Sequence, residues 1–262
     1  MRGEKSRGIK NIILMLLILG LVLVFLLPVI LTVAGSFVEP DRNNFTFNGY
    51  YQLFLNCFPF YRYFWNSVIY TFAITAGTLI ISIPAAFAFK FARFKGKNLL
   101  FVVYIINMMM PFQVMVLPNY IGLRDLGIIN TPWAIILPMI FSPFAVVVTH
   151  QYMREIDSSV IEAARLESNS AFRILLHCVV PQIKVCIAAV GLFVFADAWN
   201  MVEQPLLYVN NDKLRNLSAF IANAENFDPG VMLPASVIFM IPVFLCYMLF
   251  HEELKEGLKA LE

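Results

Sequence analysis

Long apolar segments recur along the chain, and they constrain its fold more than any other feature. A helix that crosses the hydrocarbon core of a bilayer needs about 20 apolar residues. Each segment is a continuous apolar block without alternation of period two, which argues against the strands of a membrane barrel. The sequence therefore predicts an all-α membrane protein with six transmembrane helices, at residues 9–37, 65–89, 98–121, 131–152, 183–208 and 231–250.

The composition supports a membrane protein over a water-soluble one. Hydrophobic residues make up 60% of the 262 residues and charged residues only 14%, and the mean hydropathy is +0.75. These values lie far outside those of ordinary globular domains. The first apolar run is longer than the core of a secretory signal, so a retained first span is expected. One membrane domain over residues 1–262 then accounts for the chain.

The placement of Lys and Arg predicts the orientation of the spans. If the N-terminus lies inside, most of the 19 Lys and Arg residues fall in cytoplasmic segments, as the positive-inside rule requires. Both termini are then cytoplasmic. The net charge of +2 reflects this topology, so no nucleic-acid partner is inferred from it.

The residue types that hold metals or form disulfides are scattered. The four cysteines show no CxxC spacing, and the three histidines lie far apart in the sequence. We therefore expect neither a disulfide framework nor a metal site, and no catalytic group is predicted. The residues are Cys57, Cys178, Cys186, Cys246, His150, His177 and His251.

Polar residues inside two predicted spans are candidates for a translocation pathway. In the fifth span, Asp197, Asn200 and Gln204 would lie on one stripe of a continuous helix. The third span holds Asn107 and Gln113. A carboxylate at this depth usually faces protein or a water-filled path. Two interpretations stay open: these side chains line a pathway, or they form hydrogen bonds between helices.

The segment between the fourth and fifth spans, residues 153–181, is a candidate for coupling to a cytoplasmic partner. It contains VIEAARLESNSAFRILLHCVVP, which predicts a short helix, a polar turn and an apolar helix. Glu162 and Arg165 provide charge, and Ala163 and Ala164 are small enough for a partner to approach closely. Pro181 is expected to mark the start of the next helix.

This order of residues resembles the signature loop of membrane subunits in binding-protein-dependent ABC importers. The opening matches at Glu162-Ala163-Ala164 and the close at Val179-Val180-Pro181. The family usually has Asp-Gly where this chain has Glu167-Ser168. Asn169, which tolerates a left-handed backbone, is expected to make the turn instead.

Further matches resemble the carbohydrate-uptake branch, in particular subunits similar to the smaller maltose-transporter permease. They are Leu123 to Thr131, Ala198-Trp199-Asn200, Pro205-Leu206-Leu207 and Gly257-Leu258. That branch often has Gly where this chain has Asp197.

The resemblance implies a type I ABC importer permease fold, with the family core at about residues 65–254, in a bacterial inner membrane. It implies that the ATPase-docking residues are Glu162, Ala163, Ala164, Arg165, Leu166, Glu167 and Ser168. The expected partners are the lipid bilayer, a homologous second permease, two cytoplasmic ATP-binding subunits and an extracytoplasmic sugar-binding protein. The chain has no GxxxxGK[ST] phosphate loop, so ATP and Mg are expected in the partner ATPases and no cofactor here.

Other functions remain as alternatives. An ABC permease for glycerol phosphate, amino acids or peptides would share the Glu-Ala-Ala loop. An ion-coupled secondary transporter would use ionisable pairs within the membrane. Asp197 is one candidate, but no Lys, Arg or His in the predicted spans pairs with it. A membrane enzyme would need convergent acid, base or metal groups, and the sequence suggests none.

Overall fold

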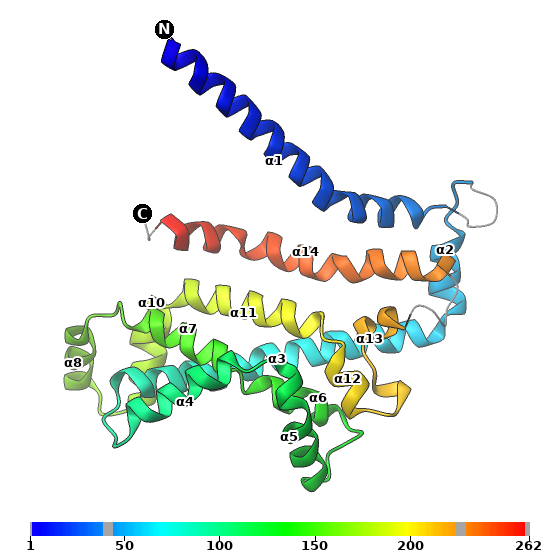
Figure 1. The fold of residues 1–262 in the computed structure, drawn as a ribbon. Coiled ribbons are helices and arrows are strands. Elements are labelled where there is room, and N and C mark those ends of the chain that lie inside the picture. Colours follow the sequence, from blue (N-terminus) through cyan, green and yellow to red (C-terminus); the bar gives the residue numbers. More distant parts are fainter. Residues whose placement is uncertain (1, 39–43, 224–228, 260–262) are drawn as a thin grey trace. The chain divides into compact units, whose positions relative to one another are not determined.

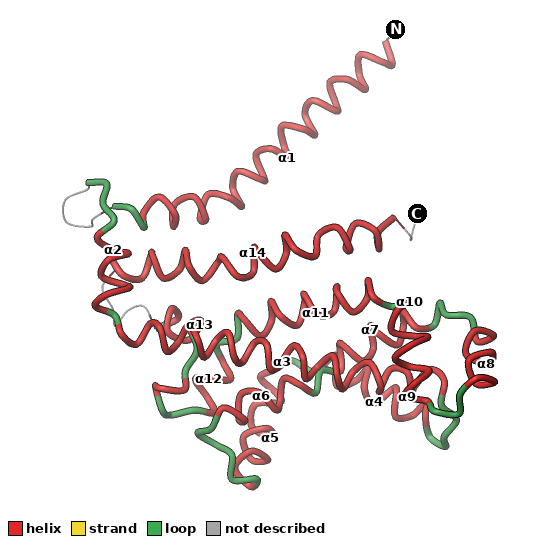
Figure 2. The backbone as a smooth tube through the Cα atoms, turned by 180° about the vertical axis from the view of Figure 1, so that it is seen from behind, coloured by secondary structure: helices red, strands yellow, loops and turns green. Residues whose placement is uncertain are grey.

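The computed structural model describes residues 2–38, 44–223 and 229–259, and these residues are almost entirely helical (Figures 1 and 2). This confirms the predicted all-α class. The chain folds as two compact units. Unit 1 comprises Met1–Phe60 and Asn223–Met240, and unit 2 comprises Tyr61–Ala222 and Ile241–Glu262.

Unit 1 contains a long apolar helix and a short aromatic segment. Helix α1, Arg2–Gly35, includes the candidate span Leu14–Gly35. It is followed, after residues 39–43, which lie outside the described ranges, by α2, Asn48–Tyr51, and a π-helical turn, Gln52–Asn56. Packing among aromatic rings holds this segment together, since centroids lie 5.3–5.5 Å apart. The rings are Phe37, Phe45, Phe47 and Tyr50.

Unit 2 contains most of the remaining helices, and two long helices contribute residues to both units. Helix α3, Phe58–Phe91, begins at the unit boundary. The last long helix, α14, is continuous over Pro229–Lys259. The other helices of unit 2 are α4 Lys97–Met109, α5 Phe112–Asp125, α6 Pro132–Ile140, α7 Pro143–Met153, α8 Ser158–Glu167, α9 Ala171–Ile174, η2 Leu175–Val179, α10 Val180–Gln182, α11 Lys184–Trp199, α12 Glu203–Tyr208, η3 Asp212–Leu214 and α13 Leu217–Ala222.

Proline placement explains several helix boundaries. Pro132 and Pro143 stand in the first turns of α6 and α7, where a missing N–H costs no hydrogen bond. Ser142 caps α7, because its hydroxyl accepts a 3.3 Å hydrogen bond from the amide of Ala145. Pro111 follows Met110, whose backbone is extended, as expected for a residue before proline.

The described ranges contain four apolar helices that are long enough to cross a membrane. If each of two bent helix pairs counts as one span, they contain up to six spans. The pair α4 and α5 bends by 109° at Met110–Pro111. The helices Ala171–Gln182 and Lys184–Trp199 bend by 85°. The continuous helix predicted across 183–208 is wrong, because α11 ends at Trp199 and α12 begins at Glu203.

The core of unit 2 brings α3, α6, α7 and α11 together. Ile74, Ile135, Met153 and Val190 are all buried in it. Helices approach closely at Gly77, where an added Cβ would lie only 2.7 Å from Cδ1 of Ile140. A side chain at position 77 would therefore make Ile140 shift, and small residues are common where membrane helices cross.

A buried hydrogen-bond network fixes the segment after α12. The side-chain amide of Asn216, which is fully buried, donates to the carbonyl of Met201 at 2.8 Å and to the hydroxyl of Ser218 at 2.7 Å. Its side-chain oxygen accepts from the amide of Ala219 at 3.2 Å. The hydroxyl of Ser67 on α3 accepts from the amide of Leu217 at 2.8 Å. The start of α13 is thereby held against α3 and the end of α11.

Candidate transport cavity and coupling helix

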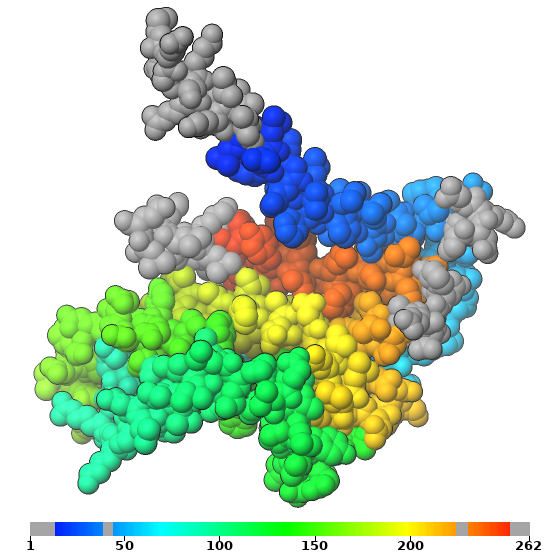
Figure 3. All heavy atoms as spheres, in the orientation of Figure 1, coloured from blue at the N-terminus to red at the C-terminus, as the bar shows by residue number. Residues whose placement is uncertain are grey.

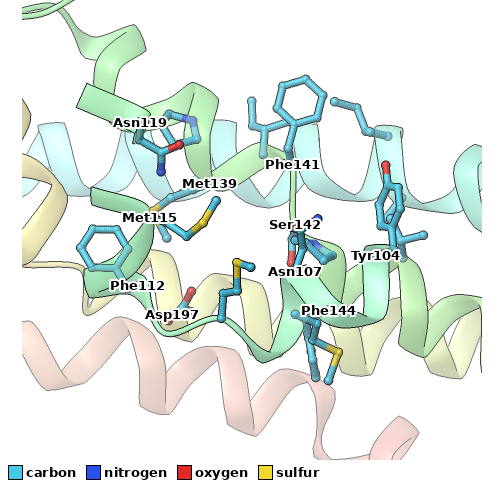
Figure 4. A pocket seen from close by; sticks show the side chains of 18 of the residues that line it. Tyr104, Asn107, Phe112, Met115, Asn119, Met139, Phe141, Ser142, Phe144 and Asp197 are labelled. Carbon is cyan, nitrogen blue, oxygen red and sulfur yellow. The ribbon is translucent and has the colours of Figure 1, made fainter. Parts of the chain in front are cut away.

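A cavity of about 660 Å³ opens among the helices of unit 2 (Figure 4). Its walls come from α3, α4, α5, α6, α7, α11 and α12. The α4–α5 bend contributes Met110 and Phe112, and the gap between α6 and α7 contributes Phe141 and Ser142. Residues at the proline breaks therefore form part of the lining.

The lining combines aromatic and apolar side chains with a few polar ones. Its aromatic residues are Tyr104, Phe112, Phe141 and Phe144. Its polar residues are Ser82, Asn107, Asn119, Ser142, Asp197 and Gln204. A concave, mostly apolar site with a few polar groups is the usual form of a small-molecule site.

Three of the five predicted pathway residues border this cavity: Asp197, Asn107 and Gln204. Asp197 reaches it from the last turn of α11 (Figure 4). Asn107 reaches it from the last turn of α4, where its side-chain amide donates to the carbonyl of Val103 at 3.0 Å. Gln204 comes from α12. The sequence predicted that Asp197, Asn200 and Gln204 lie on one stripe of a single helix. Because α11 ends before Asn200, Asp197 and Gln204 instead reach the cavity from two different helices.

The other two predicted pathway residues do not line the cavity. Asn200 terminates α11, and its side-chain amide donates to the carbonyl of Ala196 at 2.8 Å. Gln113 is exposed at the start of α5 and donates to the carboxylate of Glu203 at 3.4 Å. This contact ties α5 to α12.

The coupling segment forms a short helix at one end of unit 2, beside α9 (Figures 1 and 2). Asp157 caps α8, because its carboxylate accepts a 3.0 Å hydrogen bond from the amide of Ser159. The hydrogen bond to Ser159 lowers the pKa of Asp157 below its usual 3.8. Ile161 is only 2% exposed and anchors the helix in the core of unit 2.

The opposite face of α8 is open to solvent. Glu162 and Ala163 are exposed, and Leu166 is 91% exposed. The lime-coloured atoms of this helix stand at the margin of unit 2 in Figure 3. This face therefore leaves a large apolar side chain open to solvent beside the charged Glu162.

The helix α8 is joined to the end of α3 through Arg165. The guanidinium Nη2 of Arg165 donates to the carbonyl of Phe91 at 3.1 Å. Lys97 donates to the carbonyls of Lys90 and Ala92 at 3.4 and 3.1 Å. The last carbonyls of a helix lack partners within it and carry partial negative charge, so both cations stabilise the same terminus.

The turn after α8 does not use a left-handed residue. Ser168 is extended, with φ −150°. Among the non-glycine residues of the described ranges, only Asn130 has a positive φ, so Asn169 does not. The predicted left-handed role of Asn169 is therefore wrong. Serine hydroxyls make the turn instead: Ser168 accepts from the amide of Ser170 at 3.3 Å, and Ser170 caps α9. Pro181 lies within α10, and the break falls at Ile183.

Four cavity residues with a hydroxyl or amide side chain were not singled out by sequence: Ser82, Tyr104, Asn119 and Ser142. Ser142 carried a usable signal, because Ser followed by Pro predicts a helix start. Ser82 carried none, since a serine in an apolar span commonly bonds to its own helix. Its hydroxyl is buried without a hydrogen-bond partner in the described residues.

Apolar helices of membrane-spanning length around a partly polar cavity define an integral membrane protein of the transport class. The chain belongs to the family of binding-protein-dependent transport system inner membrane components, whose model matches residues 77–258. It is therefore an inner-membrane transport subunit.

Relatives agree with this assignment. The chain is 31% identical over 206 residues to the sn-glycerol-3-phosphate transport system permease protein UgpE of Brucella abortus (strain 2308), covering 77% of this chain and 73% of that protein. It is 25% identical over 275 residues to the arabinooligosaccharides transport system permease protein AraQ of Bacillus subtilis (strain 168), covering 98% and 97%.

Solved structures share the fold. A chain of a bacterial ABC transporter involved in the import of the acidic polysaccharide alginate matches with a TM-score of 0.85 and 19% identity, covering 96% of this chain and 98% of that one. A chain of the MetNI methionine ABC transporter in an inward-facing conformation matches with a TM-score of 0.62 and 15% identity, covering 77% and 97%. The fold is that of a type I ABC importer permease.

Proposed function

We propose that the chain is one permease subunit of an ATP-driven carbohydrate importer. It forms half of the translocation pathway beside a homologous second permease. An extracytoplasmic binding protein delivers the sugar, and two cytoplasmic subunits bind and hydrolyse ATP. Full-length similarity to an arabinooligosaccharide permease supports a carbohydrate substrate.

The proposed topology has six spans in one membrane domain and both termini in the cytoplasm. The spans are those predicted from the sequence, with helix breaks between α4 and α5 in the third, between α6 and α7 in the fourth and between α11 and α12 in the fifth. Broken helices are tolerated within a membrane where the freed backbone groups line a cavity or contact protein. The proline-rich breaks around the cavity of unit 2 support this arrangement.

The main support for the proposal is helix α8, which has one buried face and one exposed face. One face is anchored by Ile161, and the other presents Glu162, Ala163 and Leu166 to solvent. We assign this exposed face, together with Ala164, Arg165, Glu167 and Ser168, to ATPase docking. Closure of the ATPase pair would displace α8, and the spans would change from an inward-open to an outward-open pathway.

The proposal is tested by Glu162→Lys in the complete importer. Charge inversion on the exposed face is expected to abolish co-purification of the ATPase subunits, or to leave ATP hydrolysis that no longer drives uptake. Glu155→Lys is the matched control, because Glu155 is exposed and lies before α8. Unchanged uptake and co-purification in Glu162→Lys would refute the docking role. Uptake without ATP would favour an ion-coupled transporter.

A second candidate substrate is glycerol 3-phosphate. The 31% identity to UgpE supports it. Uptake assays with radiolabelled glycerol 3-phosphate and arabinooligosaccharides in the same cells distinguish the two.

A further inference from the structure

We propose that Asp197 makes this half of the pathway selective for uncharged saccharides and excludes anionic ones. The inference rests on the proposed transport function and specifies the substrate class of the same cavity. The side chain of Asp197 borders the cavity (Figure 4).

The charge of the cavity comes from the side chains that line it. All of its lining residues lie in the described part of the chain, and among them Asp197 is the only one with an ionisable carboxylate or a cationic group. No hydrogen bond or ion pair within the described residues neutralises this carboxylate. Like charges repel each other, and the repulsion grows as the distance between them shortens. A phosphate or uronate in this cavity would therefore meet repulsion without any compensating Lys or Arg.

The remaining lining suits a neutral sugar. Flat rings can cover the apolar C–H face of a pyranose or furanose, and the cavity offers Phe112, Phe141 and Phe144. Amides and hydroxyls can exchange hydrogen bonds with sugar hydroxyls, and Asn107, Asn119, Ser142 and Gln204 are available there. A carboxylate accepts strong hydrogen bonds from hydroxyl donors. The buried Ser82 hydroxyl, which has no hydrogen-bond partner among the described residues, adds another group that a bound polar molecule could satisfy.

This assignment separates the chain from two of the proteins it is similar to. UgpE is named for sn-glycerol 3-phosphate, and the matching solved structure is a transporter of an acidic polysaccharide. Both solutes are anions. AraQ is named for arabinooligosaccharides, which are neutral.

The local potential can be measured without knowing the sugar. A single cysteine is placed at Met115, which lines the cavity, in a chain whose four natural cysteines are replaced by serine. Reaction rates are measured in membranes containing the complete importer, with a trimethylammonium and a sulfonate methanethiosulfonate reagent. Asp197→Asn is expected to lower the cationic-to-anionic rate ratio by about fivefold to tenfold, because one nearby negative charge is removed.

Two variants make the result specific. Asp197→Glu keeps the charge and is expected to keep the ratio within about twofold. Asp125→Asn removes an exposed carboxylate that pairs with Arg124 and does not line the cavity, and it is expected to leave the ratio unchanged. An unchanged ratio in Asp197→Asn, or an equal fall in Asp125→Asn, would overturn the proposal.

A transport assay separates this inference from the proposed function. Uptake of the neutral trisaccharide arabinotriose and of digalacturonate is compared in cells with the complete importer. Asp197→Asn is expected to raise the digalacturonate-to-arabinotriose uptake ratio at least threefold over wild type, and an unchanged or lower ratio counts against the inference. Failure of both wild type and variant to transport any saccharide refutes the carbohydrate function, and the reagent ratio then decides the charge inference alone.

Discussion

Arg165 on α8 donates a 3.1 Å hydrogen bond to the main-chain carbonyl of Phe91, the last residue of α3. The two residues are 74 positions apart in the sequence. They connect the helix that we assign to ATPase docking with one of the long apolar helices that border the cavity. Packed helices and hydrogen bonds of this kind can carry conformational coupling between two sites.

Removal of this connection should weaken coupling without abolishing ATP hydrolysis. Arg165→Ala removes one exposed hydrogen bond with a charged donor, so its effect on folding should be small, at most about 1 kcal/mol. We expect fewer sugar molecules transported per ATP in proteoliposomes. Arg154→Ala is the control, because Arg154 donates a local 3.2 Å hydrogen bond to Gln151, one turn away. Equal stoichiometry in both variants would contradict the prediction.

Leu166 should contribute affinity rather than stability. It is 91% exposed in this chain, and burying a leucine side chain in an interface contributes about 1.5–3 kcal/mol. Leu166→Ser should therefore weaken ATPase association roughly tenfold to a hundredfold while the Tm of the isolated permease stays constant. Binding is measured by titrating purified ATPase onto immobilised permease. Leu126→Ser, an exposed leucine outside the coupling segment with 71% exposure, should bind normally.

The cap of α8 should be sensitive to acid. The hydrogen bond to Ser159 lowers the pKa of Asp157 below 3.8, so the charged carboxylate favours the folded helix. Its contribution is complete above pH 3.8 and is lost as pH falls through the lower folded-state pKa. Amide hydrogen exchange at Ser159 should therefore accelerate, relative to its intrinsic rate, only when pH falls below 3.8 and through the folded-state pKa of Asp157. Asp157→Asn keeps a capping oxygen and should remove the pH step; a step that persists would exclude Asp157 as its source.

The buried amide of Asn216 should be a stability determinant. Asn216→Ala removes three hydrogen bonds in a buried region: two that its side chain donates, to the carbonyl of Met201 and the hydroxyl of Ser218, and one that it accepts from the amide of Ala219. An unsatisfied buried polar group costs about 1–3 kcal/mol, so a Tm several degrees lower is expected in detergent by differential scanning fluorimetry. Asn210→Ala is the control, because Asn210 is exposed and engages Asn130 through its backbone amide. Equal Tm values would contradict the prediction.

The helical class and the coupling helix could be predicted from the sequence because both depend on local patterns. Continuous apolar runs specify helices in a membrane. The order of short helix, polar turn and second helix after Asp157 is found in α8 and α9. The turn chemistry was missed, because serine hydroxyls at 168 and 170 compete with the left-handed alternative at Asn169 and only the folded backbone shows which forms.

The breaks and the cavity could not be placed from local patterns. Proline permits a break at Pro111 as well as a kink at Pro118, which remains inside α5, and tertiary packing decides between them. The end of α11 at Trp199 follows no proline or glycine signal. The cavity joins side chains as far apart in sequence as Ser82 and Gln204, so its membership depends on how the helices pack.

The length of α3 gives the contact between Arg165 and Phe91 a mechanical meaning. Its 34 residues correspond to a rod about 51 Å long. If that helix pivots by about 5° at the end that contacts Arg165, a length of about 51 Å means that its far end moves by about 4 Å. A small displacement of α3 at its contact with Arg165 would thus grow with distance along the helix. The stiffness of α3, rather than the strength of this single hydrogen bond, would then set how much of the displacement reaches its far end.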